Sequence, residues 1–218
     1  MAPWARIFTI VAAVGGLAAC VGEFAVPFIL ARWVPGYSHL RNVLSELGTA
    51  GSPVAFWMNL WWCVFGVLMM AFGVATALAL PPAGDALRLM ACLFLVFGLG
   101  AGWGAGLFSM DPAGSPVTLT GRLHNALGGI GFLALGLVPL VALWVFPRPT
   151  VPGMFWLSVA TLAAGMVVVV LLSISGHGRG GDGPLSWPGL WQRAFLAVYY
   201  PYVAVLAVMM LRRAWAAG

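Results

Sequence analysis

The chain has 218 residues, of which 62% are hydrophobic and 7% are charged, and its formal net charge is +5. Water-soluble domains carry about 25% charged residues, so this composition excludes a soluble globular domain. The apolar content also excludes a disordered chain. We therefore expect an all-α polytopic integral membrane protein, with residues 1–218 forming a single transmembrane domain.

Six apolar stretches are long enough to cross a bilayer, which takes about 20 residues per helix. They cover residues 7–31, 54–80, 86–109, 124–146, 154–173 and 191–211. Proline and glycine lie in each connection between them, and none shows the period-two alternation of a membrane barrel strand. The sequence therefore predicts a six-transmembrane-helix bundle.

The first stretch has two interpretations. Leu17-Ala18-Ala19-Cys20 resembles a lipoprotein cleavage box, but the apolar run continues past Cys20 to Ala31. A run of this length favours an uncleaved spanning helix over a short signal region.

Six spans place both termini on one side of the membrane. Arginine counts on the two sides are equal, five against five, so the positive-inside rule does not decide by number. Arg212 and Arg213 directly flank the last span, and this favours cytoplasmic termini. The net positive charge suits an anionic lipid surface. The sequence has no basic stripe with interleaved aromatic residues, so we do not expect it to bind nucleic acid.

The first, third and fifth connections must open on the same side. With the adjoining helix ends they hold all three histidines, and with them several other polar residues: His39, Arg41, Ser45, Glu46, Asp111, Arg122, His124, His177, Asp182 and Arg193. Membrane proteins place costly polar groups where they are used, so we expect the functional site at this mouth. The alternative is that loops simply collect polar residues.

Glu23 lies inside the first span, where a charge costs about 2.5–3.5 kcal/mol on insertion scales. It is expected to face protein. One interpretation is a protonated side chain bonded to a neighbouring helix, and the other is a ligand or proton carrier at the floor of a cavity.

Two segments at the mouth carry chemistry-bearing residues. Apolar residues at helical spacing in Tyr37–Gly48 predict a short interfacial amphipathic helix that bears Ser45. Asp111 ends the third span and His124 begins the fourth, so a short connection brings them near each other. Asp111 is then predicted to orient His124 as a general base, or else to cap a helix.

A zinc site is a weak alternative, with His39, Asp111, His124 and His177 as ligands and Glu46 in place of Asp111 as a variant. The sequence has no closely spaced histidine pair of the form H-x-x-x-H. Gly98, Gly102 and Gly106 predict a close-packing helix face. The aromatic residues at 57, 61, 62 and 65 are typical of interfacial and lipid-facing positions.

The chain resembles the bacterial six-span membrane family catalogued as domain of unknown function 998. The residues that carry the resemblance, in chain order, are Tyr37-Ser38, Ser45–Gly48, Ser52-Pro53, Asn59, Asp111-Pro112, Gly121–His124 and Gly189–Arg193. The family usually has Asp at 46, Phe-Pro at 109–110 and Glu at 192. The resemblance implies the architecture and this choice of residues, but no reaction.

A looser similarity, in residue types only, links the chain to the membrane hydrolase superfamily of the alkaline ceramidases. That superfamily uses Ser, Asp and three His around zinc near one membrane face. This chain lacks its closing H-x-x-x-H and one of its seven spans, so the similarity is an analogy.

Three hypotheses about function remain open at this point. The first is binding or transport of a membrane lipid or other amphiphile, with Glu23, Arg41, Glu46, Arg122, Asn125 and Arg193 as ligand-binding residues. The second is a hydrolase or transferase acting on a lipid, with Asp111, His124 and Ser45 as catalytic residues and zinc as an optional cofactor. The sequence places binding first. A third reading is an accessory subunit without a ligand.

Overall fold

The computed structural model describes residues 1–81, 84–177 and 183–217, and the side chains of residues 176 and 177 lie outside this part. All regular elements in these ranges are helices. Within these ranges, six helices or helix runs are long and apolar enough to cross a membrane. The prediction of an all-α bundle with six spans is confirmed.

The spans follow the predicted stretches closely. Their elements are α1 (Pro3–Leu30) with η1 (Ala31–Trp33), α2 (Ala55–Ala79), α3 (Asp85–Phe97) with η3 (Gly98–Gly104) and α4 (Ala105–Leu107), α5 (Leu119–Val145), α6 (Pro152–His177) and α7 (Pro188–Ala216). Two short helices lie in connections, η2 (Leu44–Gly48) and η4 (Pro184–Ser186). The structure begins α5 five residues before the predicted start, because Thr118 caps the helix by accepting the Gly121 N–H.

The third span departs from regular α-helix in its glycine-rich part, where η3 is a π-helix. A Cβ on Gly98 or Gly102 would lie 2.4–2.8 Å from atoms of α2, and one on Gly100 would lie 2.4 Å from the Leu127 carbonyl oxygen of α5. The predicted close-packing face is confirmed. It is two-sided, because alternate glycines admit α2 and α5.

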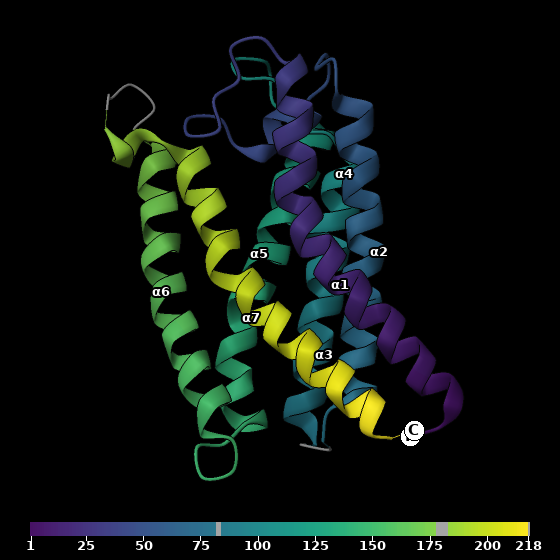
Figure 1. The fold of residues 1–218 in the computed structure, drawn as a ribbon. Coiled ribbons are helices and arrows are strands. Elements are labelled where there is room, and N and C mark those ends of the chain that lie inside the picture. Colours follow the sequence, from purple (N-terminus) through teal and green to yellow (C-terminus); the bar gives the residue numbers. More distant parts are fainter. Residues whose placement is uncertain (82–83, 178–182, 218) are drawn as a thin grey trace.

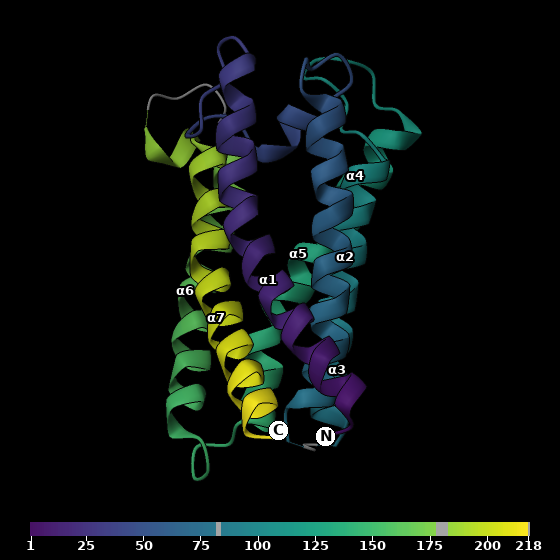
Figure 2. The same cartoon turned by 45° about the vertical axis from the view of Figure 1, so that its right-hand side comes forward.

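The termini lie at one end of the bundle and the connection that carries η2 lies at the other (Figures 1 and 2). Helix α6 is the most peripheral span and packs mainly on α7. A hydrogen bond of 2.8 Å joins Ser158 Oγ to Tyr202 Oη, and Gly165 gives room for the Tyr199 ring. The pair α6–α7 therefore forms one wall that stands beside α5.

The predicted amphipathic helix over Tyr37–Gly48 is wrong for most of its length. Residues 39–41 form a turn, and only Leu44–Gly48 is helical, as the 3-10 helix η2. Leu44 and Leu47 are buried in the bundle. The apolar spacing therefore reflects side chains that anchor a turn-rich loop to the bundle.

Candidate functional site

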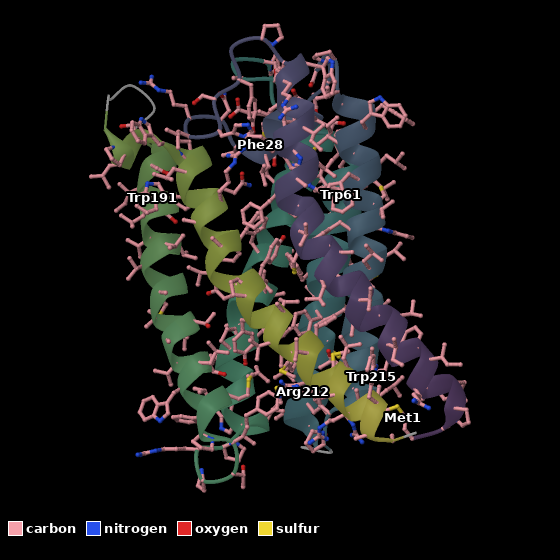
Figure 3. The ribbon with its side chains drawn as sticks, viewed as in Figure 1. Met1, Phe28, Trp61, Trp191, Arg212 and Trp215 are labelled. Carbon is pink, nitrogen blue, oxygen red and sulfur yellow. The ribbon has the colours of Figure 1, made fainter. Side chains whose placement is uncertain are left out.

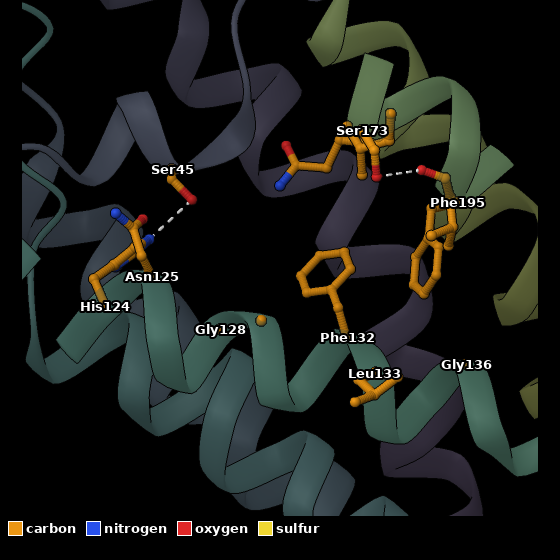
Figure 4. A pocket seen from close by; sticks show the side chains of 13 residues that line it. Ser45, His124, Asn125, Gly128, Phe132, Leu133, Gly136, Ser173 and Phe195 are labelled. Carbon is orange, nitrogen blue, oxygen red and sulfur yellow. Dashed lines mark hydrogen bonds between the residues drawn. The ribbon is translucent and has the colours of Figure 1, made fainter. Parts of the chain in front are cut away.

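The central feature of the site is a hydrogen bond between Ser45 and His124. Ser45 lies on η2 and His124 lies in the second turn of α5, and their Oγ and Nε2 atoms are 3.0 Å apart (Figure 4). His124 is only 4% exposed. A contact between two residues that are 79 positions apart brings a hydroxyl and a base together inside the bundle.

The hydrogen bond of the other ring nitrogen determines which nitrogen of His124 carries the proton. Nδ1 lies 2.7 Å from the carbonyl oxygen of Phe108, at the end of α4. A carbonyl only accepts hydrogen bonds, so Nδ1 carries the proton, and Nε2 of the neutral ring accepts from the Ser45 hydroxyl. A nucleophile, a base and a third group that orients the base form the arrangement used in nucleophilic catalysis.

Arg193 of α7 holds the loop that carries Ser45. Its Nη1 donates to the carbonyl oxygens of His39, Asn42 and Gly189 at 2.7–3.0 Å, and its Nη2 lies 2.9 Å from Tyr37 Oη and 3.1 Å from His39 Nδ1. Partial burial and the nearby guanidinium lower the pKa of His39 below its ordinary value. Arg193 was predicted as a headgroup ligand, but its contacts are with the protein's own loop.

Neighbouring residues of α7 extend this attachment. A Cβ on Gly189 would lie 2.3 Å from the Asn42 carbonyl oxygen, so only glycine permits this approach. Leu190 N donates to Leu40 O, and Leu44 N donates to Gln192 Oε1 at 2.6 Å. Because Leu44 directly precedes Ser45, the start of α7 fixes the position of the hydroxyl.

Glu46 and Asn59 complete the support of η2. Glu46 accepts from the Asn42 side chain and from Val43 N, so it stabilises the start of its own 3-10 helix. Asn59 of α2 donates to the carbonyl of Gly48 and to Ser109 Oγ. These contacts give Glu46 a local structural role.

A cavity of about 450 Å³ begins at Ser45 and His124 and runs between α5 and the α6–α7 wall. Its wall includes Leu133 and Val169, which are 64% and 43% exposed on the bundle surface. The cavity therefore opens sideways, at the level of the apolar helices. Figure 4 shows the side chains that line it along α5. Asn125 also lines it, whereas Arg41 and Arg122 are exposed side chains outside its lining.

Glycines on α5 create this space. Gly128, Gly129 and Gly136 line the cavity, and a Cβ on Gly128 or Gly129 would meet no heavy atom within 4 Å. Phe132 and Phe195 line the same space. An apolar cavity with a few polar groups at one end is the usual form of a site for an amphiphilic small molecule.

Glu23 of α1 is 6% exposed and receives two indole hydrogen bonds from α2. Trp61 Nε1 donates to Oε2 at 2.7 Å, and Trp62 Nε1 donates to Oε1 at 3.1 Å. Figure 3 shows Trp61 in the half of the molecule that lies away from the two termini. Glu23 therefore faces protein, bonded to a neighbouring helix.

The predicted Asp111–His124 pair is not formed. The Asp111 carboxylate accepts from the backbone N–H and the hydroxyl of Thr118 at 2.9 and 2.6 Å, and both nitrogens of His124 are engaged elsewhere. The Thr118 bonds lower the pKa of Asp111 below its usual value. Asp111 supports the cap of α5, which was the alternative interpretation.

The predicted zinc ligands do not come together. Within residues 1–81, 84–177 and 183–217, no three His, Cys, Asp or Glu side chains are grouped to hold a metal ion. His39 bonds to Arg193, and His124 bonds to Ser45 and Phe108. The side chain of His177 lies outside the described part of the chain, as does Asp182.

Sequence reasoning missed several residues of the site. Trp61 and Trp62 were assigned to lipid-facing positions, yet Trp62 is only 3% exposed and both bind Glu23. A buried indole N–H needs an acceptor, and Glu23 was the acceptor available in a neighbouring span. Gln192 and the cavity glycines gave no such signal, because their roles depend on how the helices pack.

Fold and site together define an all-α polytopic membrane protein with a Ser–His pair at the inner end of a laterally open cavity. A family model matches residues 17–209, which is most of the chain. The chain belongs to this family, described as "Protein of unknown function (DUF998)". The searches of curated proteins and of solved structures gave no match.

Proposed function

We propose that this protein is a membrane-embedded hydrolase or acyl transferase that acts on an ester of a lipid-like amphiphile. The observation that supports this most strongly is the Ser45–His124 hydrogen bond with its Phe108 carbonyl partner, at the end of an apolar cavity. The sequence placed binding or transport first; this geometry favours the enzyme.

Ser45 would be the nucleophile and His124 the general base. As Oγ attacks the ester carbon, its proton moves to Nε2, and the Phe108 carbonyl stabilises the Nδ1–H of the imidazolium. The proton then passes to the departing alcohol, and the acyl group stays on Ser45 as an ester.

The developing oxyanion needs hydrogen-bond donors. Asn125 and Gln192 line the cavity beside Ser45. Because the Gln192 oxygen accepts from Leu44 N, its side-chain NH₂ group remains available to donate. These two amides are the donors we assign to the oxyanion.

A membrane lipid is the natural partner for a cavity that opens at helix level. The acyl chain would lie along Gly129, Phe132 and Phe195, and the headgroup would remain toward the loop end of the bundle. The bacterial inner membrane, with both termini in the cytoplasm, is the location that we propose with it.

A fluorophosphonate probe tests the proposal. We expect it to label purified wild-type protein at Ser45, because an activated serine displaces fluoride from phosphorus. Ser45→Ala is expected to show no label, and Ser52→Ala, a loop serine outside the cavity, is expected to label normally. Intact and peptide mass spectrometry gives the readout. A wild-type protein that binds lipid but takes no label would contradict the enzyme and favour a binding protein.

A second prediction concerns the acyl chain. A Cβ on Gly129 would meet no heavy atom within 4 Å, so Gly129→Leu can extend into the cavity that Gly129 lines, and leucine favours a helix more than glycine does. We expect the preference for p-nitrophenyl octanoate over p-nitrophenyl acetate to fall by about tenfold or more, since single methylenes in an apolar site are worth 10–200-fold.

Gly153→Leu provides the matched control for this prediction. It is the same substitution at an open position near the start of α6, at the end of the bundle opposite Ser45. An unchanged octanoate preference in Gly129→Leu would show that the acyl chain does not bind in this cavity.

A further inference from the structure

A second, smaller cavity adjoins Ser45 and His124 on the side of the bundle interior. Its volume is about 40 Å³. Five polar side chains from four elements line it, namely Glu23, Ser45, His124, Gln192 and Tyr200. A buried water needs roughly 10–15 Å³ and 2–4 polar partners, so this inner cavity has both the room and the partners for a water molecule.

Glu23 retains hydrogen-bonding capacity toward this space. A carboxylate has about four acceptor positions, and the indoles of Trp61 and Trp62 occupy one on each oxygen. They also hold the carboxylate in a fixed orientation. An ionised or polar group in a span is costly unless it is fully bonded, so a water on the remaining positions is favourable.

The two cavities meet at the Ser–His pair. Ser45, His124 and Gln192 line both, whereas α6 contributes only to the outer cavity and Glu23 only to the inner one. An acyl chain attached to Ser45 would fill the outer cavity and block approach from the lipid side. A second reactant of small size then has to reach the acyl carbon from the inner cavity.

We propose that the inner cavity holds the water that hydrolyses acyl-Ser45, and that Glu23 is the positioning residue for this water. The inference rests on the proposed function and selects hydrolysis over transfer. The water oxygen attacks the acyl carbon while His124 Nε2 takes one of its protons. The bond from carbon to Oγ breaks, Ser45 regains a proton from His124, and a carboxylic acid leaves. Glu23 accepts a hydrogen bond from the water throughout.

Accumulation of acyl-enzyme is the test. Wild-type protein given p-nitrophenyl octanoate is expected to turn over with little octanoyl-Ser45 in its intact mass spectrum. Glu23→Gln is expected to release about one equivalent of nitrophenol in a burst and then to accumulate octanoyl-Ser45. Its steady-state rate should fall by about tenfold or more, as expected for a misplaced reactant. Added methanol should restore release as methyl octanoate, which a merely misfolded variant would not do.

Ala105→Leu makes the test independent of Glu23, because Ala105 also lines the inner cavity. A leucine there displaces the water and leaves the carboxylate in place, so it should accumulate the same acyl-enzyme. Thr76→Val, a buried polar change in α2 away from both cavities, is the control and should behave as wild type.

Different outcomes separate the two proposals. Normal release of octanoic acid by both Glu23→Gln and Ala105→Leu would overturn the assignment of the water site. Wild-type protein that stays acylated until methanol is added would also overturn it, and would indicate a transferase. Failure of wild-type Ser45 to react with either the ester or the fluorophosphonate would contradict the proposed function itself.

Discussion

Replacing His124 with alanine is expected to slow hydrolysis of p-nitrophenyl octanoate by about 10²–10⁴-fold, the usual contribution of a positioned general base. The reason is specific to this arrangement. Nε2 is the acceptor for the Ser45 hydroxyl, and the Phe108 carbonyl keeps the proton on Nδ1. Without the ring, Ser45 becomes an ordinary alcohol. Steady-state kinetics in detergent micelles give the measurement, and the rate of fluorophosphonate labelling should fall in parallel.

Asp111→Asn is the informative companion to this variant. Asp111 contacts Thr118 and not His124, so its substitution should leave turnover within a few-fold of wild type. A loss of turnover as large as that of His124→Ala would instead support the Asp111–His124 pair that the sequence predicted. Unchanged turnover in His124→Ala would exclude His124 as the base.

The second large effect is expected for Arg193→Met. The change keeps an unbranched apolar stem but removes every donor to His39, Asn42, Gly189 and Tyr37. Hydrogen bonds to a charged group contribute about 1.5–3 kcal/mol each, so a loss of about 3 kcal/mol or more in unfolding free energy is expected. Ser45 labelling should be lost with it, because the same loop carries Ser45.

Two measurements separate this effect from general damage. Thermal unfolding in detergent reports the stability, and limited trypsin cleavage after Arg41 reports the release of the loop. Arg122→Met, at an exposed position on α5, is the control and should change neither. An Arg193→Met protein with wild-type stability, loop protection and labelling would show that the guanidinium does not hold the loop.

The spans and their order were predictable because crossing a bilayer demands long apolar helices. The glycines of the third span were also interpretable, since small residues at helical spacing admit close neighbours. Ser45 and His124 were each found as chemistry-bearing residues. The enzyme hypothesis also grouped them as nucleophile and base, but with Asp111 as the group that orients His124. That group is instead a backbone carbonyl, which leaves no trace in the side-chain pattern.

Charged residues at the mouth were the main source of error. Arg193 and Asp111 look like free ligands in a sequence, but both are used to satisfy the protein's own polar groups, the loop carbonyls and the start of α5. Trp61 and Trp62 were misassigned for the converse reason. Their large apolar rings would fit a lipid-facing position, but their indole N–H groups need an acceptor, and both donate to Glu23.

The attachment of η2 to the start of α7 has a consequence for biosynthesis. Leu44 and Gln192 are 148 positions apart, so most of the polypeptide must be inserted before the serine loop can take its shape. A nascent chain that still lacks its final span lacks this attachment of η2. For the hydrolase proposed above, the consequence is that Ser45 becomes aligned only after the last span has been made.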